Sequence, residues 1–194
     1  MKFVQDQRTL TVPRLVLVSG MPATGKSTLA EMVAEALGWP LFTKDRFKEL
    51  LFDVGHYDVA TFGRAQSRVI GAQSVELLKS IATTLLGSGV NVILESNFLP
   101  ELAAQGMRPI LHNVDVRQIY CTVAPELFLA RYEARIAADQ RHPVHVDRLA
   151  LPELVERIGT DLHGPVPVDA PLLTVDTTEA YSPSIEEIVA FCRS

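Results

Sequence analysis

The sequence predicts an α/β fold in which a parallel β-sheet is covered by helices on both faces. Short apolar runs rich in β-branched residues alternate along the chain with longer segments of helical periodicity, and this alternation is typical of a parallel sheet. The first apolar run, LVLVSG at 15–20, also ends in a glycine-containing loop that leads directly into a helical segment. The 194 residues are expected to form one domain, 1–194.

Five apolar runs are expected to be the strands of this sheet. Each is short and mostly apolar, as is usual for strands that are buried on both faces. The expected strands lie at 15–20, 39–43, 90–98, 116–123 and 172–177.

Helical segments are expected between these strands. The segment 27–37 has apolar residues at helical spacing and ends at Gly38, and Gly55 ends the segment 45–52. A long helix is expected at 61–86. The residues expected near its apolar face are Val69, Ala72, Gln73, Leu77, Ile81 and Leu85.

Proline positions mark the later helices. Helices are expected to begin at Pro100, at Pro125 and at about Pro152. A closing helix is expected at 184–192, where Ser184 and Glu187 have the spacing of a capping box.

Charge and cysteine content limit the classes of protein. The formal net charge of −5 disfavours a protein whose main task is to coat nucleic acid, although a nucleic-acid end could still be a substrate in a local basic pocket. Cys121 and Cys192 lack a CxxC pattern and are expected to be reduced, buried thiols. The polar N-terminus argues against a signal peptide, and no apolar run approaches the roughly 18 residues that span a bilayer. We therefore expect a cytoplasmic protein.

The most specific motif is GMPATGKS at 20–27, which fits G-x-x-x-x-G-K-[ST] at every fixed position. Glycines let the backbone curl so that its N–H groups point at an anion, and the helix that follows aims its positive end at the same place. Lys26 is expected to reach the β- and γ-phosphates, and the Ser27 hydroxyl to ligate Mg²⁺. The residues predicted to bind the nucleotide in this loop are Gly20, Met21, Pro22, Ala23, Thr24, Gly25, Lys26, Ser27 and Thr28.

A candidate catalytic base follows the second expected strand. In a parallel sheet this strand end lies on the same edge as the phosphate loop, so Asp45 is expected to face the γ-phosphate. A carboxylate there can accept the proton of an attacking hydroxyl. Alternatively, Asp45 or Thr43 simply caps the helix. The cations Lys44, Arg46 and Lys48 hold an anionic substrate or phosphate, or form a solvated face.

The loop and this aspartate together resemble the small P-loop kinases that phosphorylate a hydroxyl. That group includes chloramphenicol phosphotransferase, the kinase domain of polynucleotide kinase, gluconate kinase and zeta-toxin-like kinases. The stretches FTKDRFKELLFD, VILESNF and RHPVHVDRL resemble an uncharacterised branch labelled AAA-type ATP-binding proteins, in which a glycine is expected in place of Val144. The resemblance implies a three-layer P-loop NTPase fold with a five-stranded parallel sheet in the order 2-3-1-4-5, and a helical lid at about 126–150.

Glu95 stands at the end of the third expected strand, where the pattern is similar to a Walker B strand. Aspartate is more usual there, and the longer glutamate favours an outer-shell role toward Mg²⁺ through water. Ser27 and Glu95 are thus the predicted metal residues. The alternative is a polar residue at the mouth of a strand, and Asn97 could instead contact the acceptor.

The resemblance also implies a lid that carries arginines over the nucleotide phosphates. Arg131 and Arg135 are four residues apart and share one helix face, and Arg141 follows beyond the helix. Where an arginine finger has been tested, it contributes about 10³ to 10⁵ in rate. The alternative is a solvated helix face. His142 and His145 are expected to shape the lid rather than to bind metal.

The loop after the fifth expected strand is the candidate adenine border. In similar kinases this loop lies beside the base, which implies that Asp176, Thr177 and Thr178 contact the nucleotide. A plain turn between a strand and a helix explains these residues equally well.

These observations predict an Mg²⁺-dependent kinase that transfers the γ-phosphate of ATP to a hydroxyl of a small molecule, such as an antibiotic, a sugar or a nucleoside-like metabolite. Asp45 is the predicted base, Lys26 holds the phosphate, and Arg131 or Arg135 closes the site. The first alternative is a kinase of nucleic-acid 5′-hydroxyls or nucleotide sugars. The second is an ATPase or nucleotide switch that acts on a protein partner. A monomer and a homodimer both remain open.

Overall fold

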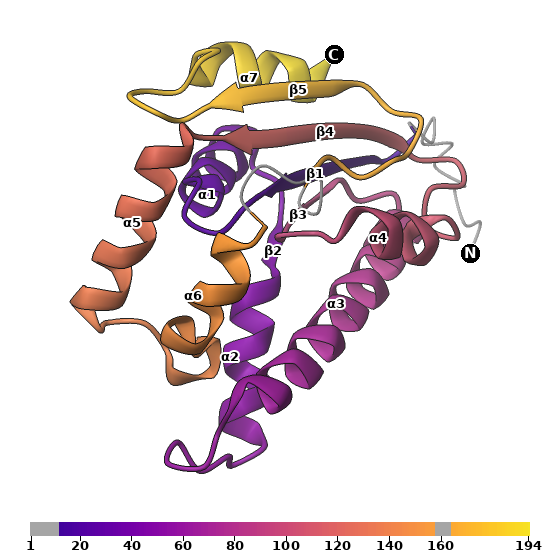
Figure 1. Cartoon of the computed structure of the whole chain (residues 1–194). Helices are drawn as coiled ribbons and strands as arrows, with labels where there is room; N and C mark the ends of the chain where they lie inside the picture. The colour runs from indigo at the N-terminus through magenta and orange to yellow at the C-terminus, as the bar shows by residue number, and fades with distance from the viewer. Residues whose placement is uncertain (1–11, 158–163) are drawn as a thin grey trace, which may run out of the picture.

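A five-stranded parallel sheet forms the centre of the protein (Figure 1). The structure is a computed structural model that describes residues 12–157 and 164–194. The strand order is β2-β3-β1-β4-β5, which confirms the predicted fold and strand order. The strands are β1 (Arg14–Gly20), β2 (Leu41–Thr43), β3 (Val92–Glu95), β4 (Asp115–Thr122) and β5 (Leu172–Asp176).

Helices follow the strands and cover both faces of the sheet (Figure 1). Gly38 has φ of 68° and ends the first helix as predicted, and Ser184 and Glu187 form the predicted capping box of the last helix. The helices are α1 (Lys26–Leu37), α2 (Lys44–Val54), α3 (Arg64–Gly87), α4 (Pro100–Met107), α5 (Pro125–Ala138), the short 3₁₀ helix η1 (Pro143–His145), α6 (Asp147–Val155) and α7 (Ile185–Arg193).

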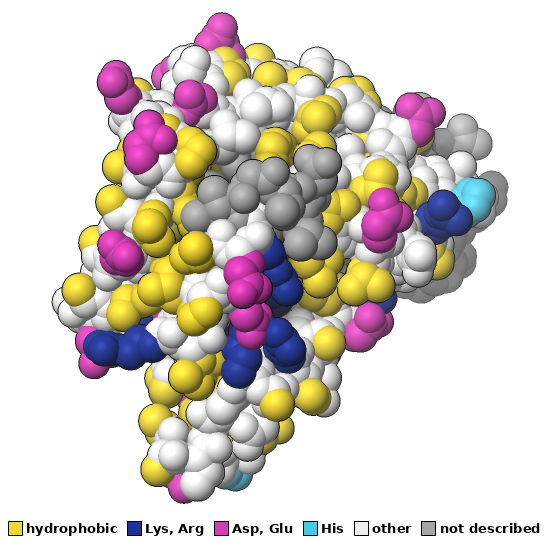
Figure 2. Space-filling model, viewed as in Figure 1, with side chains coloured by type: hydrophobic (Ala, Val, Ile, Leu, Met, Phe, Trp, Pro, Cys, Tyr) yellow, Lys and Arg dark blue, Asp and Glu magenta, His cyan; other side chains and the backbone are white. Residues whose placement is uncertain are grey.

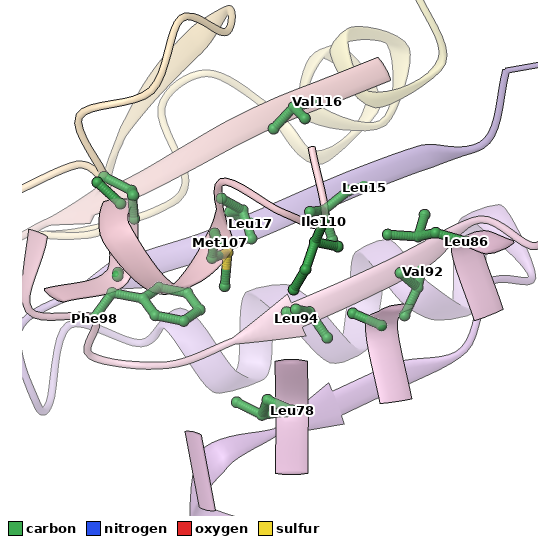
Figure 3. Close-up of a cluster of buried hydrophobic side chains, with 14 residues drawn as sticks. Leu15, Leu17, Leu78, Leu86, Val92, Leu94, Phe98, Met107, Ile110 and Val116 are labelled. Atoms are coloured by element: carbon green, nitrogen blue, oxygen red, sulfur yellow. The ribbon is translucent and has the colours of Figure 1, made fainter. Parts of the chain in front are cut away.

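The alternation of side chains along β1 builds a core on each side of the sheet. Leu15 and Leu17 pack with α3 and α4 on one face (Figure 3). Val16 and Val18 pack with α1 and α7 on the other face. Because successive strand residues point to opposite faces, one apolar strand supports both cores. The sheet is therefore held rigidly, with the carboxyl ends of β1, β2 and β3 at one edge.

The apolar face predicted for α3 is wrong. Val69 is 58% exposed and Leu77 is 36% exposed. The side that is buried carries several small and polar residues, which a search for apolar periodicity passes over. The buried residues of α3 are Ser67, Ile70, Gly71, Ser74, Leu78, Ala82 and Leu86.

The start predicted for α6 is also wrong. The helix begins at Asp147, and Pro152 lies inside it. Asp147 forms ion pairs with Arg135 and Arg141, so tertiary contacts hold the first turn although the proline lacks an N–H. Proline was interpreted as the start of this helix, and the predicted start therefore lies too late in the chain.

Within the described residues, α3 is long and apolar enough to cross a membrane, by length and composition alone. No membrane span was expected from the sequence, because charged and polar residues interrupt the apolar runs of α3. Ile70, Leu78 and Leu86 of this helix are buried among other side chains of the domain, and core helices often satisfy the same two criteria. The signal-peptide expectation concerns N-terminal residues of which 1–11 lie outside the described part of the chain.

Candidate active site

The loop between β1 and α1 adopts a conformation that requires glycine. Gly20 has φ of 143°, and a Cβ atom added there would lie 2.5 Å from the carbonyl oxygen of Cys121. Gly25, the N-cap of α1, has φ of 75° and supplies no capping side chain. The amides of the first turn of α1 therefore stay available to an anion, as expected for a loop that binds phosphates.

Lys26, Ser27 and Glu95 meet at the carboxyl ends of β1 and β3. The Lys26 ammonium lies 3.6 Å from Oε1 of Glu95, and the Ser27 hydroxyl donates a hydrogen bond of 3.2 Å to Oε2. Both Lys26 and Glu95 are buried. Burial raises the pKa of Glu95, while the charge of Lys26 acts in the opposite direction. The structure thus brings the predicted phosphate and metal residues together.

The hydroxyl of Ser27 and the carboxylate of Glu95 fit a magnesium site. Mg²⁺ prefers oxygen ligands, and a hydroxyl and a carboxylate stand here within hydrogen-bond distance of one another. Their position beside the phosphate loop is the one from which a cation can be shared with nucleotide phosphates.

Asp45 lies in the first turn of α2, where Thr43 is the residue that caps the helix. The Thr43 hydroxyl accepts a hydrogen bond of 3.3 Å from the backbone N–H of Arg46. The Asp45 carboxylate is therefore not needed as a cap, and it pairs instead with Arg141 of the lid. His145 also approaches Asp45, with Nδ1 4.0 Å from Oδ1.

The charges around Asp45 keep its carboxyl group ionised. Burial raises the pKa of Asp45, but the charges of His145, Arg141, Lys26 and Lys44 outweigh this effect, and the pKa falls below its usual value. Burial lowers the pKa of His145 to about 4. His145 is therefore neutral at pH 7, and the arginine and the lysines are the cations that act on Asp45 there.

The lid consists of α5, η1 and α6, and its charges converge on Asp147. The Arg141 guanidinium donates hydrogen bonds of 3.0 and 3.2 Å to the two oxygens of Asp147. Nε of Arg135 lies 3.3 Å from Oδ2 of the same carboxylate. The Tyr132 hydroxyl donates to Oδ1 at 3.1 Å, and the Arg135 guanidinium stacks over the Tyr132 ring at 4.4 Å. Arg141 thus bridges the lid carboxylate and Asp45 of α2.

Arg131 points away from this cluster and toward the loop after β5. Its guanidinium donates to the carbonyl oxygens of Thr177 and Thr178 at 2.8 and 3.0 Å. The Thr177 hydroxyl lies 2.8 Å from the carbonyl oxygen of Thr24, and the Asp176 carboxylate accepts a hydrogen bond of 2.8 Å from the N–H of Thr178. The predicted adenine border is therefore tied to the phosphate loop. Contact of Arg131 with phosphate stays a prediction.

A cavity of about 750 Å³ joins these groups. Its lining includes Lys26 and Ser27 of the phosphate loop and Gly71 and Met107 of α3 and α4. Asp45 and Arg141 line the same cavity. Figure 2 shows lysine and arginine side chains gathered beside acidic ones in the middle of this face of the molecule.

Sequence reasoning missed Asp147, and it placed Arg141 and His145 in the lid without predicting their contacts with Asp45. Arg141, His145 and Asp147 all follow α5, and no single motif marks them. The only signal was the run RHPVHVD, in which charged residues and histidines surround a proline. Their roles depend on a lid that folds back onto α2, which is a contact between residues about 100 positions apart.

Comparison with known proteins identifies the family. A family model described as an AAA domain matches residues 15–159. The chain belongs to the AAA_33 family. Its fold is that of the small P-loop kinases, as the resemblance in sequence implied.

Solved structures agree with membership of the AAA_33 family. A candidate kinase from Chloroflexus aurantiacus is 36% identical, with a TM-score of 0.83, and the match covers 94% of this chain and 98% of that one. A sugar kinase from Janibacter is 16% identical over 93% of this chain and 95% of its own, with a TM-score of 0.64. The APS kinase of Mycobacterium tuberculosis, solved with AMPPNP and APS, is 19% identical over 94% and 98%, with a TM-score of 0.57. The last two support the fold alone.

Among curated proteins, an uncharacterised protein of Mycobacterium tuberculosis is 39% identical over 92 residues. The match covers 44% of this chain and 18% of the mycobacterial protein. The chain thus matches less than a fifth of the length of this relative.

Proposed function

We propose that the protein is an ATP-dependent kinase that phosphorylates a hydroxyl of a small molecule, with Asp45 as the general base. The observation that carries the proposal is that Asp45 and Lys26 line one cavity, so a hydroxyl beside the carboxylate faces a phosphate held by the loop. The cavity volume of about 750 Å³ lies within the usual range for a small-molecule site. The cytoplasm, where ATP is abundant, is the compartment that suits this reaction.

Each charged group has a role in the proposed transfer. Lys26 and the loop amides hold the β- and γ-phosphates of ATP, and Arg135 and Arg141 neutralise charge from the lid. Ser27 and Glu95 would hold Mg²⁺, Glu95 through water, and the ion would neutralise phosphate charge. Closure of α5, η1 and α6 excludes water, so that the acceptor hydroxyl competes with hydrolysis.

Asp45 accepts the proton in this reaction. An electron pair of the acceptor oxygen forms the new bond to the γ-phosphorus, and the bond from that phosphorus to the β–γ bridging oxygen breaks. The acceptor proton passes to a carboxylate oxygen of Asp45, and ADP leaves with the bridging oxygen. Because the surrounding cations lower the pKa of Asp45, its carboxyl group is ionised and ready at neutral pH.

The test is label transfer from γ-labelled ATP to a panel of hydroxyl compounds. The Asp45→Asn substitution is expected to lower kcat by about 10² to 10⁴ and to leave ATP binding nearly unchanged. Asp53→Asn is the matched control, because Asp53 is an exposed carboxylate on the same helix. Steady ATP hydrolysis without any acceptor, unchanged by Asp45→Asn, would instead identify an ATPase or switch.

A further inference from the structure

Two lysines of α2, the buried Lys48 and the half-buried Lys44, line the cavity and form no ion pair with a carboxylate of the described residues. Lys48 is only 6% exposed, and its ammonium donates a hydrogen bond of 2.7 Å to the Ser67 hydroxyl. The Lys44 ammonium donates at 2.7 Å to Oδ1 of Asn97. Both partners are neutral. No carboxylate in the described ranges, 12–157 and 164–194, lies within ion-pair distance of either ammonium.

Other cations that line the cavity are paired, which makes the two lysines distinctive. Arg64 and Arg68 both contact Glu153, at 2.9 and 2.8 Å. Lys79 contacts Glu76 at 2.6 Å. A buried charge without a counter-charge destabilises a fold, and burial lowers the pKa of both lysines, that of Lys48 to about 8. The protein therefore keeps two lysines of lowered pKa at one place, although the charge of Asp45 acts in the opposite direction on both.

The lysines lie beside Asp45, the proposed base. Lys48 follows Asp45 by three residues, which places both on one face of α2. The two lysine stems converge on α3, because a Cβ atom on Gly71 would lie 3.7 Å from Cε of Lys44 and 3.8 Å from Cε of Lys48. By contrast, Arg46 is exposed to solvent. Of the three cations that the sequence grouped together, two enter the cavity.

The hydrogen bonds around Lys48 leave donors for a ligand. The Ser67 hydroxyl donates its own proton to the carbonyl oxygen of Val144 at 2.8 Å, so it accepts from Lys48. One of the three N–H groups of Lys48 is used in this way. The cavity wall also carries apolar side chains, which are Val75 of α3 and Leu102, Ala103 and Met107 of α4.

We propose that Lys48, assisted by Lys44, binds an anionic group of the acceptor, either a carboxylate or a phosphate ester. The acceptor is then a hydroxyl compound whose anion lies against α2, whose hydroxyl faces Asp45 and whose remaining carbon skeleton packs against α4. This inference rests on the proposed kinase function. A neutral acceptor would leave both ammonium groups with neutral hydrogen-bond partners alone in the closed enzyme.

The first experiment compares matched acceptors with γ-labelled ATP. Hydroxy acids are paired with their primary amides, and sugar phosphates with the parent sugars, so that the two arms distinguish a carboxylate from a phosphate ester. The charged member of at least one pair is expected to have a kcat/KM tenfold or more above its neutral partner. Lys48→Met should remove most of this difference through KM, and Lys48→Arg should preserve part of it. Equal or better use of the neutral members would overturn the proposal.

The second experiment does not depend on transfer. Protein labelled with ¹³C at lysine Cε is saturated with Mg²⁺ and the non-hydrolysable analogue AMPPNP, and then titrated with acetate and with inorganic phosphate. The Lys48 signal, assigned by its loss in Lys48→Met, should shift saturably with one of the two anions. The signal of Lys79, which is paired with Glu76, should not. A Lys48 signal that responds to neither anion would refute the anion site, even if the protein proves to be a kinase. A saturable shift without transfer to any acceptor would refute the kinase and retain the anion site.

Discussion

Two parts of the cavity wall differ in how their cations are paired. The phosphate loop with Glu95 is called the phosphate end here, and the part of α2 that carries Lys44 and Lys48 is called the acceptor end. At the phosphate end, Lys26 is satisfied by Glu95 before any nucleotide arrives. At the acceptor end, Lys44 and Lys48 have only neutral partners. The difference teaches that the phosphate end is organised by the protein alone, whereas the acceptor end, under the proposal, is completed by its ligand. Substitutions at each end should therefore differ in whether they damage activity, stability or both.

The largest effect is expected at Arg141, which joins the lid to Asp45, the proposed base. Arg141→Met should lower kcat by about 10³ or more, because the lid loses a cation that neutralises the transferred phosphate. The pKa of Asp45 should also rise, since Arg141 helps to lower it. A protonated carboxyl group cannot act as a base. As the pH is lowered, Arg141→Met should therefore lose transfer activity at a higher pH than the wild type does. Steady-state kinetics from neutral pH down to below 3.8, the usual pKa of an aspartate, measure both effects.

Arg148→Met is the matched control for this prediction, because Arg148 is an exposed arginine of the same lid. Its kcat and pH profile should match those of the wild type. If Arg141→Met were equally active, the ion pair with Asp45 would be a resting contact of the lid without a part in transfer.

The second-largest expected effect is an increase in stability when Lys48 of the acceptor end is replaced by methionine. The pKa of Lys48 is lowered from 10.5 to about 8 by burial, so between these values the unfolded chain binds more protons than the folded one. Wild-type stability from this group should therefore rise as the pH increases from about 8 to about 10.5, by up to about 3 kcal/mol. Below pH 8, Lys48→Met should be more stable than the wild type, because it buries no charge.

Urea unfolding at several pH values tests this prediction, with Arg46→Met as the exposed control on the same helix. The advantage of Lys48→Met should shrink above pH 8, while the control shows no such trend. Destabilisation by Lys48→Met at pH 7 would mean that the charge is compensated in the folded protein, which would weaken the contrast between the two ends.

The smallest effect is expected at the adenine border. Thr177→Val removes the hydroxyl that lies 2.8 Å from the Thr24 carbonyl oxygen. We expect a loss of about 1 kcal/mol in stability and an increase of about fivefold in KM for ATP, with little change in kcat. Thr83→Val, which removes an exposed hydroxyl bonded within α3, should leave KM unchanged. An unchanged KM for ATP in Thr177→Val would show that this loop does not contribute to nucleotide binding.

The phosphate end could be predicted from the sequence because its chemistry is local. Gly20, Gly25, Lys26 and Ser27 fall within eight residues, and the required backbone conformation restricts which residues can stand there. Glu95 was found because parallel strands place their carboxyl ends at one edge. The fold itself followed from the alternation of strands and helices.

The acceptor end could not be predicted in the same way, because its side chains come from separate elements. Lys48 meets Ser67 of α3, and Arg141 meets Asp45 of α2, through contacts that no spacing rule encodes. The sequence could list Lys44, Arg46 and Lys48 as cations of one segment. Lys44 and Lys48 line the cavity whereas Arg46 faces solvent, and this difference is visible in the structure alone.

The burial of both native thiols offers a direct way to watch the lid. Cys121 and Cys192 are free and buried, and burial raises their pKa values to about 12 and about 11. Thiolates are the species that react with maleimide dyes, so both native cysteines are protected from labelling in the folded protein. A fluorophore pair on Leu149→Cys in α6 and Glu31→Cys in α1, both exposed positions, would attach selectively. Energy transfer between the dyes could then follow individual molecules as they open and close around nucleotide.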